Sequence, residues 1–475
     1  MPIAAAFVVP HPPLALPGVG RGQERQIAST VSAYKKVAKR IAELKPDVLI
    51  ISSPHATSYY DYIHVSPGTR GAGDFSAYND PSDRIEVAYD AALATAISKE
   101  ASKTRIPAGT AGERVKELDH GTMVPLYFIQ TAGTTVPIVR IGISGLSALD
   151  HYRFGQCVAR AIEKLGRRAV FVASGDLSHK LKKSGPYGFS AAGPAFDREI
   201  CKILAAGDFS ALLQMDQTMC ENAAECGLRS FQMMAGALDG KFVRSELLSH
   251  EGPFGVGYGI AAFEPLGPSP LRHFGDALEK QQIDALSEVR SQEDPYVRLA
   301  RKALESWVLT KRRIKVSPDT PWVSTSETAG FTLPDDMLTQ RSGVFVSIKK
   351  KGELRGCIGT LEATRRCVGD EIVENAISAG TRDPRFPTIK PTELKLLVYS
   401  VDVLGEPEVI DGPGQLAPTR YGVIVSTCDG RRGVLLPDLE GIDTPEKQVY
   451  IARSKGGIDP YERVTLQRFE VVRHR

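Results

Sequence analysis

The chain has 475 residues, a formal net charge of +3 and 42% hydrophobic residues, which is typical of a globular protein with two or three domains. Lysine and arginine are spread evenly along it, which argues against a nucleic-acid-binding protein, because such proteins gather positive charge on one face or segment. No apolar run reaches the roughly 18–20 residues of a membrane helix, the first residues lack a basic leader, and the seven cysteines form no CxxC pair. We therefore expect a cytoplasmic protein without a disulfide framework or a zinc ribbon.

Strand-like and helix-like patterns alternate as far as about residue 265. The apolar runs of strand length are residues 4–9, 47–52, 136–143 and 168–174, and the helical patterns are residues 27–44 and 151–165. Because these strands are apolar throughout, we expect an α/β domain with a mostly parallel sheet that is covered by helices on both faces. Ligands of such sheets bind beyond the carboxyl ends of the strands.

A Pro/Gly/Ser break at residues 266–272 marks a change of pattern. We expect a first domain at residues 1–266, a linker with a polar helical segment at 267–292, and a second domain at 293–475. Alternating runs, the hairpin turns Lys351-Gly352 and Asp429-Gly430, and one helix at Val368–Gly380 predict a smaller α+β second domain with a largely antiparallel sheet.

Histidines occupy similar places in the first half of the chain. His11, His55 and His179 each follow a predicted strand, and His120 lies in a loop that leads into an apolar segment. Carboxyl ends of parallel strands meet at one edge, so these side chains can come together and bind a metal ion through neutral imidazoles. A single histidine after a strand is more often an ordinary loop residue, and it is the repetition of the pattern that favours a site.

The third ligand is expected to be an acid, and two candidates remain. Glu225 precedes an apolar stretch that could be a helix, whereas Asp176 lies at a strand end. A histidine that does not bind the ion would transfer protons. The remaining histidines have no comparable context and are expected to be surface or packing residues: His64, His151, His250, His273 and His474.

Four motifs, in this order, resemble the class III extradiol ring-cleavage dioxygenases of the LigB type and the Memo-like proteins that share their fold: FVVPHPP, ISSPHA, LDHGTMVPL and VASGDLSHKL. The resemblance covers about residues 1–265. It implies an Fe(II) ion held by His11, His55 and Glu225, with His179 as acid/base and His120 in contact with the substrate. It also implies O₂-dependent action on a catechol-like or other small redox-active molecule.

The Memo branch has a cysteine in a Cys-Gly context at the third ligand position, and this chain reads Glu225-Cys226-Gly227. A carboxylate suits iron, whereas a thiolate suits copper or zinc. We favour Glu225 with Fe(II) and keep Cys226 with Zn(II) or Cu as the alternative.

The segments GELRGCIGTLE, TRDPRFPTIKPTEL and YGVIVS resemble the AMMECR family over about residues 293–475. Joined to a Memo-like domain, this resemblance points to the AmmeMemoRadiSam system, whose radical SAM component would be a separate protein because this chain has no CxxxCxxC motif. A second candidate function is therefore a metal-binding accessory protein without ring cleavage.

In the AMMECR-like segment, five residues form a candidate second-domain cleft. The arginines and the acid either line an anion-binding cleft or form surface ion pairs, and the cysteine is either a nucleophile or a packing residue. They are Arg355, Cys357, Arg382, Asp383 and Arg385.

Overall fold

The computed structural model describes residues 2–317, 333–350, 352–439 and 441–475. The chain divides into two compact units, Met1–Glu279 and Lys280–Arg475. The division lies within helix α10 (Phe274–Ser291), which occupies most of the segment expected to be a linker. The domain boundaries expected from the sequence stay a prediction, and the two units are described separately.

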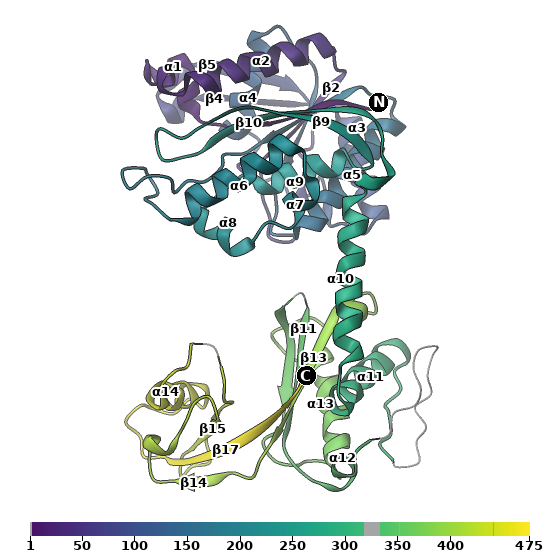
Figure 1. Cartoon of the computed structure of the whole chain (residues 1–475), viewed down its shortest axis with the longest axis vertical. Coiled ribbons are helices and arrows are strands. Elements are labelled where there is room, and N and C mark those ends of the chain that lie inside the picture. Colours follow the sequence, from purple (N-terminus) through teal and green to yellow (C-terminus); the bar gives the residue numbers. More distant parts are fainter. Residues whose placement is uncertain (1, 318–332, 351, 440) are drawn as a thin grey trace. The chain divides into compact units, whose positions relative to one another are not determined.

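A six-stranded sheet with the order β7-β2-β8-β1-β10-β9 forms the first unit (Figure 1). The pairs β7–β2, β2–β8 and β8–β1 are parallel, whereas β10 and β9 add to the sheet antiparallel. This confirms the mostly parallel sheet expected from the sequence. Its strands are β1 (Ile3–Val9), β2 (Val48–Ser53), β7 (Ile138–Gly142), β8 (Ala169–Ser174), β9 (Lys241–Glu251) and β10 (Tyr258–Pro268).

The central strands read as continuous apolar runs because both of their faces are buried. In β1, Ala6 and Val8 belong to one core and Phe7 and Val9 to the other, as the two-residue period of a strand requires. Helices α2 (Ala28–Leu44) and α4 (His120–Thr131) cover the second core. The first core is covered by α3 (Ala91–Lys103), α5 (Ala148–Lys164), α6 (Ala192–Ala206), α7 (Phe209–Leu213) and α9 (Leu228–Ala237).

Helices α5 and α9 approach each other very closely. A Cβ atom at Gly155 would lie 1.9 Å from the carbonyl oxygen of Met233, and one at Gly236 would lie 1.9 Å from that of Tyr152. Real Cβ contacts are never so short, so only glycine permits this packing. The contact fixes α9, and thereby the loop with Glu225 and Cys226 that precedes it.

Shorter elements complete the first unit. They are α1 (Pro17–Gly20), α8 (Gln217–Ala223), the parallel pair β3 (Ile63–His64) and β6 (Ala108–Gly109), and the antiparallel pair β4 (Arg70–Phe75) and β5 (Asp80–Ala88). Across the described part of the chain, no helix combines the length and the apolar character that crossing a membrane requires.

The second unit contains a seven-stranded antiparallel sheet with the order β12-β11-β13-β17-β15-β16, in which β14 also pairs with β17. This confirms the α+β domain with an antiparallel sheet. Lys351 lies outside the described residues, but the strands on either side of it pair as a hairpin does, and so do those around Asp429-Gly430. The elements are α11 (Pro295–Thr310), α12 (Asp335–Thr339), β11 (Val344–Lys350), β12 (Glu353–Gly359), α13 (Val368–Thr381), β13 (Leu397–Leu404), β14 (Glu408–Ile410), β15 (Tyr421–Ser426), β16 (Arg432–Leu435), α14 (Pro445–Lys455) and β17 (Thr465–His474).

Candidate metal centre

Three histidines meet at the carboxyl edge of the parallel strands. His11 follows β1 and His55 follows β2, and their Nε2 atoms lie 3.1 Å apart. His120, the first residue of α4, places its ring centroid 4.0 Å from that of His55 and 5.3 Å from that of His11. His11 is buried and His55 is exposed, so the group opens to solvent on the His55 side.

The thiol of Cys226 completes a group of side chains that could hold a metal ion. Its Sγ atom lies 3.6 Å from Nε2 of His11, and the ligand atoms of His11, His55 and Cys226 all lie within 4.8 Å of one another. In a tetrahedral zinc site, ligand atoms at 2.0–2.3 Å from the ion are about 3.3–3.6 Å apart. The 3.1 and 3.6 Å separations are close to these values and the remaining pair lies within 4.8 Å, so the three side chains could close around an ion of this size with a small adjustment.

The Glu225 side chain is hydrogen-bonded at the start of helix α9. Its carboxylate accepts a hydrogen bond of 2.7 Å from the backbone N–H of Leu228, at the start of α9, where helical N–H groups lack partners. Burial raises the pKa of Glu225 to about 7. Among the described residues, the group that could hold an ion contains Cys226 together with His11 and His55, and it does not contain Glu225. The choice of the third ligand stays a prediction.

Asp176, the other acid considered from the sequence, contacts two of the candidate ligands, His11 and Cys226. Its carboxylate accepts a 2.8 Å hydrogen bond from the backbone N–H of His11, and its own N–H lies 3.3 Å from Sγ of Cys226. Its second oxygen lies 3.8 Å from Nε2 of His11. Burial raises the pKa of Asp176 to about 6.

The imidazoles are suited to bind a cation because partial or full desolvation favours their neutral form. Desolvation lowers the pKa of His11 and of His55, and it lowers that of His120 to about 3. Nδ1 of His11 lies 2.9 Å from Oγ of Ser174, so a proton on Nδ1 leaves the Nε2 lone pair free for an ion. Burial also raises the pKa of the Cys226 thiol, and a bound cation would offset that cost by stabilising the thiolate.

His179 lies beside the histidine group and not within it. Its Nδ1 atom lies 2.6 Å from the carbonyl oxygen of Ala224, so the loop that carries Cys226 also holds this ring. The His179 ring packs edge-on against Tyr187 with centroids 5.0 Å apart. A positive charge on His179 would lower the pKa of His11, which places it within electrostatic reach of the group.

A buried arginine, which the sequence reasoning missed, supports His120. Arg140 in β7 is 1% exposed and donates to the carbonyl oxygens of Val115 and Glu117 at 2.9 and 2.7 Å. Its guanidinium also lies 3.9 Å from Asp119, whose carboxylate accepts from the N–H of Thr122 and caps α4. The sequence could have indicated this arginine, because a charged residue in the apolar run VPIVRIGI must be paired inside the protein.

Hydrogen bonds and ion pairs engage the five second-domain candidates. The Asp383 carboxylate accepts from the backbone N–H of Cys357 at 2.9 Å and pairs with Arg385 at 2.8 Å. Arg355 pairs instead with Glu393, and Arg382 with Glu374. These contacts are ion pairs, and the choice between an anion-binding cleft and surface ion pairs stays a prediction.

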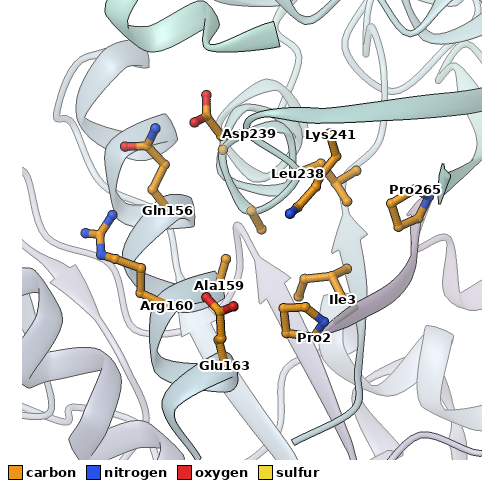
Figure 2. A pocket seen from close by; sticks show the side chains of 12 residues that line it. Pro2, Ile3, Gln156, Ala159, Arg160, Glu163, Leu238, Asp239, Lys241 and Pro265 are labelled. Carbon is orange, nitrogen blue, oxygen red and sulfur yellow. The ribbon is translucent and has the colours of Figure 1, made fainter. Parts of the chain in front are cut away.

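A separate pocket of about 170 Å³ lies at the opposite end of β1 (Figure 2). Pro2 and Ile3 line it together with the polar side chains of Arg160, Asp239 and Lys241. The seven residues of β1 span about 23 Å. This pocket is therefore not part of the histidine group.

Comparison with known proteins agrees with the two-part architecture. Residues 5–261 match the family of the catalytic LigB subunit of aromatic ring-opening dioxygenase, and residues 297–474 match the AMMECR1 family. A protein of Clostridium acetobutylicum is 39% identical over 484 residues, with 100% of each chain covered. A protein of Thermotoga maritima is 41% identical over 185 residues, which are 38% of this chain and 98% of that protein.

Among solved structures, an uncharacterized protein of Pyrococcus horikoshii is 29% identical and covers 38% of this chain and 88% of its own, with a TM-score of 0.32. The family matches, and the full-length relative, carry the assignment. The chain belongs to the LigB family, with an N-terminal LigB domain joined to a C-terminal AMMECR1 domain.

Proposed function

We propose that the LigB domain is a metal-dependent oxidoreductase that acts on a small redox-active substrate, such as a catechol, with O₂. The observation that carries the proposal is the histidine group at the solvent-accessible edge of the sheet, where the Nε2 atoms of His11 and His55 lie 3.1 Å apart and His120 lies beside His55. A bound ion would supply Lewis acidity and open positions for substrate and O₂. The ligand set suits iron, copper or zinc, and only the first two are redox-active.

The chain's own residues prepare the site for proton transfer. His120 lies against His55 and is neutral at physiological pH, so it can accept or donate a hydrogen bond to a substrate hydroxyl. His179 is fixed through Nδ1 by Ala224, which leaves its Nε2 atom as the proton carrier. Asp176 keeps His11 and Cys226 in place through its backbone and carboxylate.

A second candidate is a Memo-like accessory protein that binds metal without ring cleavage and works with a separate radical SAM enzyme. Two observations favour it: a thiol, and not a carboxylate, lies beside the two imidazoles, and the same chain carries an AMMECR1 domain. In this case the metal site is retained, while catechol and O₂ are not consumed.

Metal analysis and O₂ uptake on anaerobically purified full-length protein distinguish these functions. We expect about one ion per chain in the wild type, and loss of that ion in the double variant His11→Ala/His55→Ala. His179→Ala should keep the metal and lose turnover by roughly 10²–10⁴-fold. Metal without O₂ uptake would favour the accessory function, and full metal occupancy in the double variant would contradict both.

A further inference from the structure

A histidine and an aspartate form a pair behind the segment that carries His179. His250 on β9 places its Nε2 atom 2.8 Å from Oδ2 of Asp197 on α6. Asp197 is 2% exposed, whereas the His250 side chain is 34% exposed. The hydrogen bond to Asp197 is the largest of the contributions that raise the pKa of His250 to about 10, so the two groups form an ion pair at neutral pH. Sequence reasoning had set His250 aside as a surface or packing residue.

The other oxygen of this carboxylate holds the backbone next to His179. Oδ1 of Asp197 accepts a 2.9 Å hydrogen bond from the backbone N–H of Ser178, and the carbonyl oxygen of Ser178 accepts one of 2.7 Å from the N–H of Gly257. A Cβ atom at Gly257 would lie 2.1 Å from Oδ2 of Asp197, so only glycine leaves room for the carboxylate there. Asp197 and Gly257 therefore fix the peptide groups on both sides of Ser178.

The loop that follows α8 holds His179 from the other side. The backbone N–H of His179 donates to the carbonyl oxygen of Ala223 at 3.1 Å, and its Nδ1 atom lies 2.6 Å from that of Ala224. Oγ of Ser178 also donates to the carbonyl oxygen of Ala223, at 3.0 Å. Because a carbonyl oxygen can only accept, the contact at Nδ1 requires a proton on Nδ1, and Nε2 of the neutral ring then carries none. The tautomer of His179 thus depends on how the backbone at Ser178 is placed against this loop.

We propose that Asp197 and His250 are positioning residues for His179. The ion pair fixes the Asp197 carboxylate, the carboxylate fixes the N–H of Ser178, and the imidazole of the next residue is thereby kept in the Nδ1–H tautomer. The consequence for catalysis rests on the proposed function, in which His179 transfers protons. Only an unprotonated Nε2 atom can accept the proton of a substrate hydroxyl, so the pair behind His179 keeps it ready as a base.

The test is the tautomer of His179 in the full-length protein, read by NMR after labelling histidines with ¹⁵N, because protonated and unprotonated ring nitrogens have different chemical shifts. The spectrum of His179→Ala identifies the signals, and Zn(II) is the metal added because it is diamagnetic. We expect the Nδ1–H form in the wild type, and a ratio of Nδ1–H to Nε2–H that falls about three-fold or more in His250→Ala. His250→Gln, whose amide N–H can still donate to Asp197, should restore most of the wild-type ratio.

The matched control is His273→Ala, because His273 also pairs with a carboxylate, Asp239, at 2.8 Å. This variant should leave the tautomer of His179 unchanged. Equal ratios in the wild type and in His250→Ala would overturn the proposal. So would the Nε2–H form of His179 in the wild type, a measurement that needs no variant to fold.

O₂ uptake gives a second readout of the same pair. With a catechol as substrate, His250→Ala should lower kcat while KM and metal content stay close to those of the wild type, because proton transfer and not binding is impaired. An unchanged kcat would contradict the positioning role. Absence of O₂ uptake in the wild type would contradict the proposed function alone, since the NMR measurement tests the pair without any turnover.

Discussion

Replacing the buried Arg140 by methionine should destabilise the first unit and loosen the segment before His120. The arginine donates hydrogen bonds to Val115 and Glu117 and to Oγ of Ser66 at 2.7 Å. Hydrogen bonds from a charged group each contribute about 1.5–3 kcal/mol, but methionine recovers part of this through apolar packing. Because the two carbonyls and the nearby Asp119 lose their partner in the interior, we expect a net cost of about 3–5 kcal/mol in the free energy of unfolding.

Hydrogen exchange measured peptide by peptide is the appropriate assay, since the two units need not unfold together. In Arg140→Met, amides of residues 115–120 should exchange much faster, and the first unit should unfold at lower denaturant concentration. The matched control is Arg84→Met, which removes an exposed arginine paired with Glu86 and should change stability by less than about 0.5 kcal/mol. If Arg140→Met left both the exchange of this segment and the stability unchanged, the assigned role of Arg140 would be wrong.

Two further predictions concern packing and charge. Gly236→Ala should lower the free energy of unfolding by at least about 2 kcal/mol, because its methyl group would meet the carbonyl oxygen of Tyr152. Gly267→Ala, which has open space around it, should be nearly neutral. Thermal unfolding compares the two variants, and equal melting temperatures would contradict the close packing of α5 on α9. Hydrogen bonds from Lys103 and Lys164 lower the pKa of Glu100 to about 2, so this carboxylate stabilises the fold above its unfolded pKa of about 4.3 and loses that effect as the pH falls through 2. Glu100→Gln should therefore cost about 1 kcal/mol at pH 7, and the difference from wild type should shrink in unfolding measurements between pH 4 and pH 2; a difference independent of pH would contradict the assignment.

The sequence predicted those parts of the fold that are buried on both faces. The strands β1, β2 and β8 are unbroken apolar runs, and they could be recognised without knowledge of their neighbours. The edge strand β9 was not predicted, because its sequence KFVRSELLSHE mixes charged and apolar residues and only its pairing with β10 makes it a strand. Its missed assignment also concealed the partnership of His250 with α6.

The candidate site, too, could be predicted only in part from the sequence. Placement of His11 and His55 after parallel strands was enough to expect them together, because the edge of the sheet is fixed by topology. The third ligand could not be chosen, since Glu225 and Cys226 lie in a loop before α9 where no periodicity assigns directions to neighbouring side chains. In this loop, hydrogen-bond partners set the direction of each side chain. The backbone N–H of Leu228 binds the Glu225 carboxylate, and the backbone N–H of Asp176 lies beside the Cys226 thiol.

X-ray absorption spectroscopy at the edge of the bound metal tests the central claim most directly, because it reports the ligand atoms themselves. We predict one sulfur at about 2.3 Å together with nitrogen ligands at about 2.0–2.1 Å, in the wild type and in Glu225→Gln alike. In Cys226→Ser the sulfur contribution should disappear and metal affinity should fall. A shell of nitrogen and oxygen alone in the wild type, lost in Glu225→Gln and unchanged in Cys226→Ser, would contradict the His11/His55/Cys226 centre and restore the carboxylate as the third ligand.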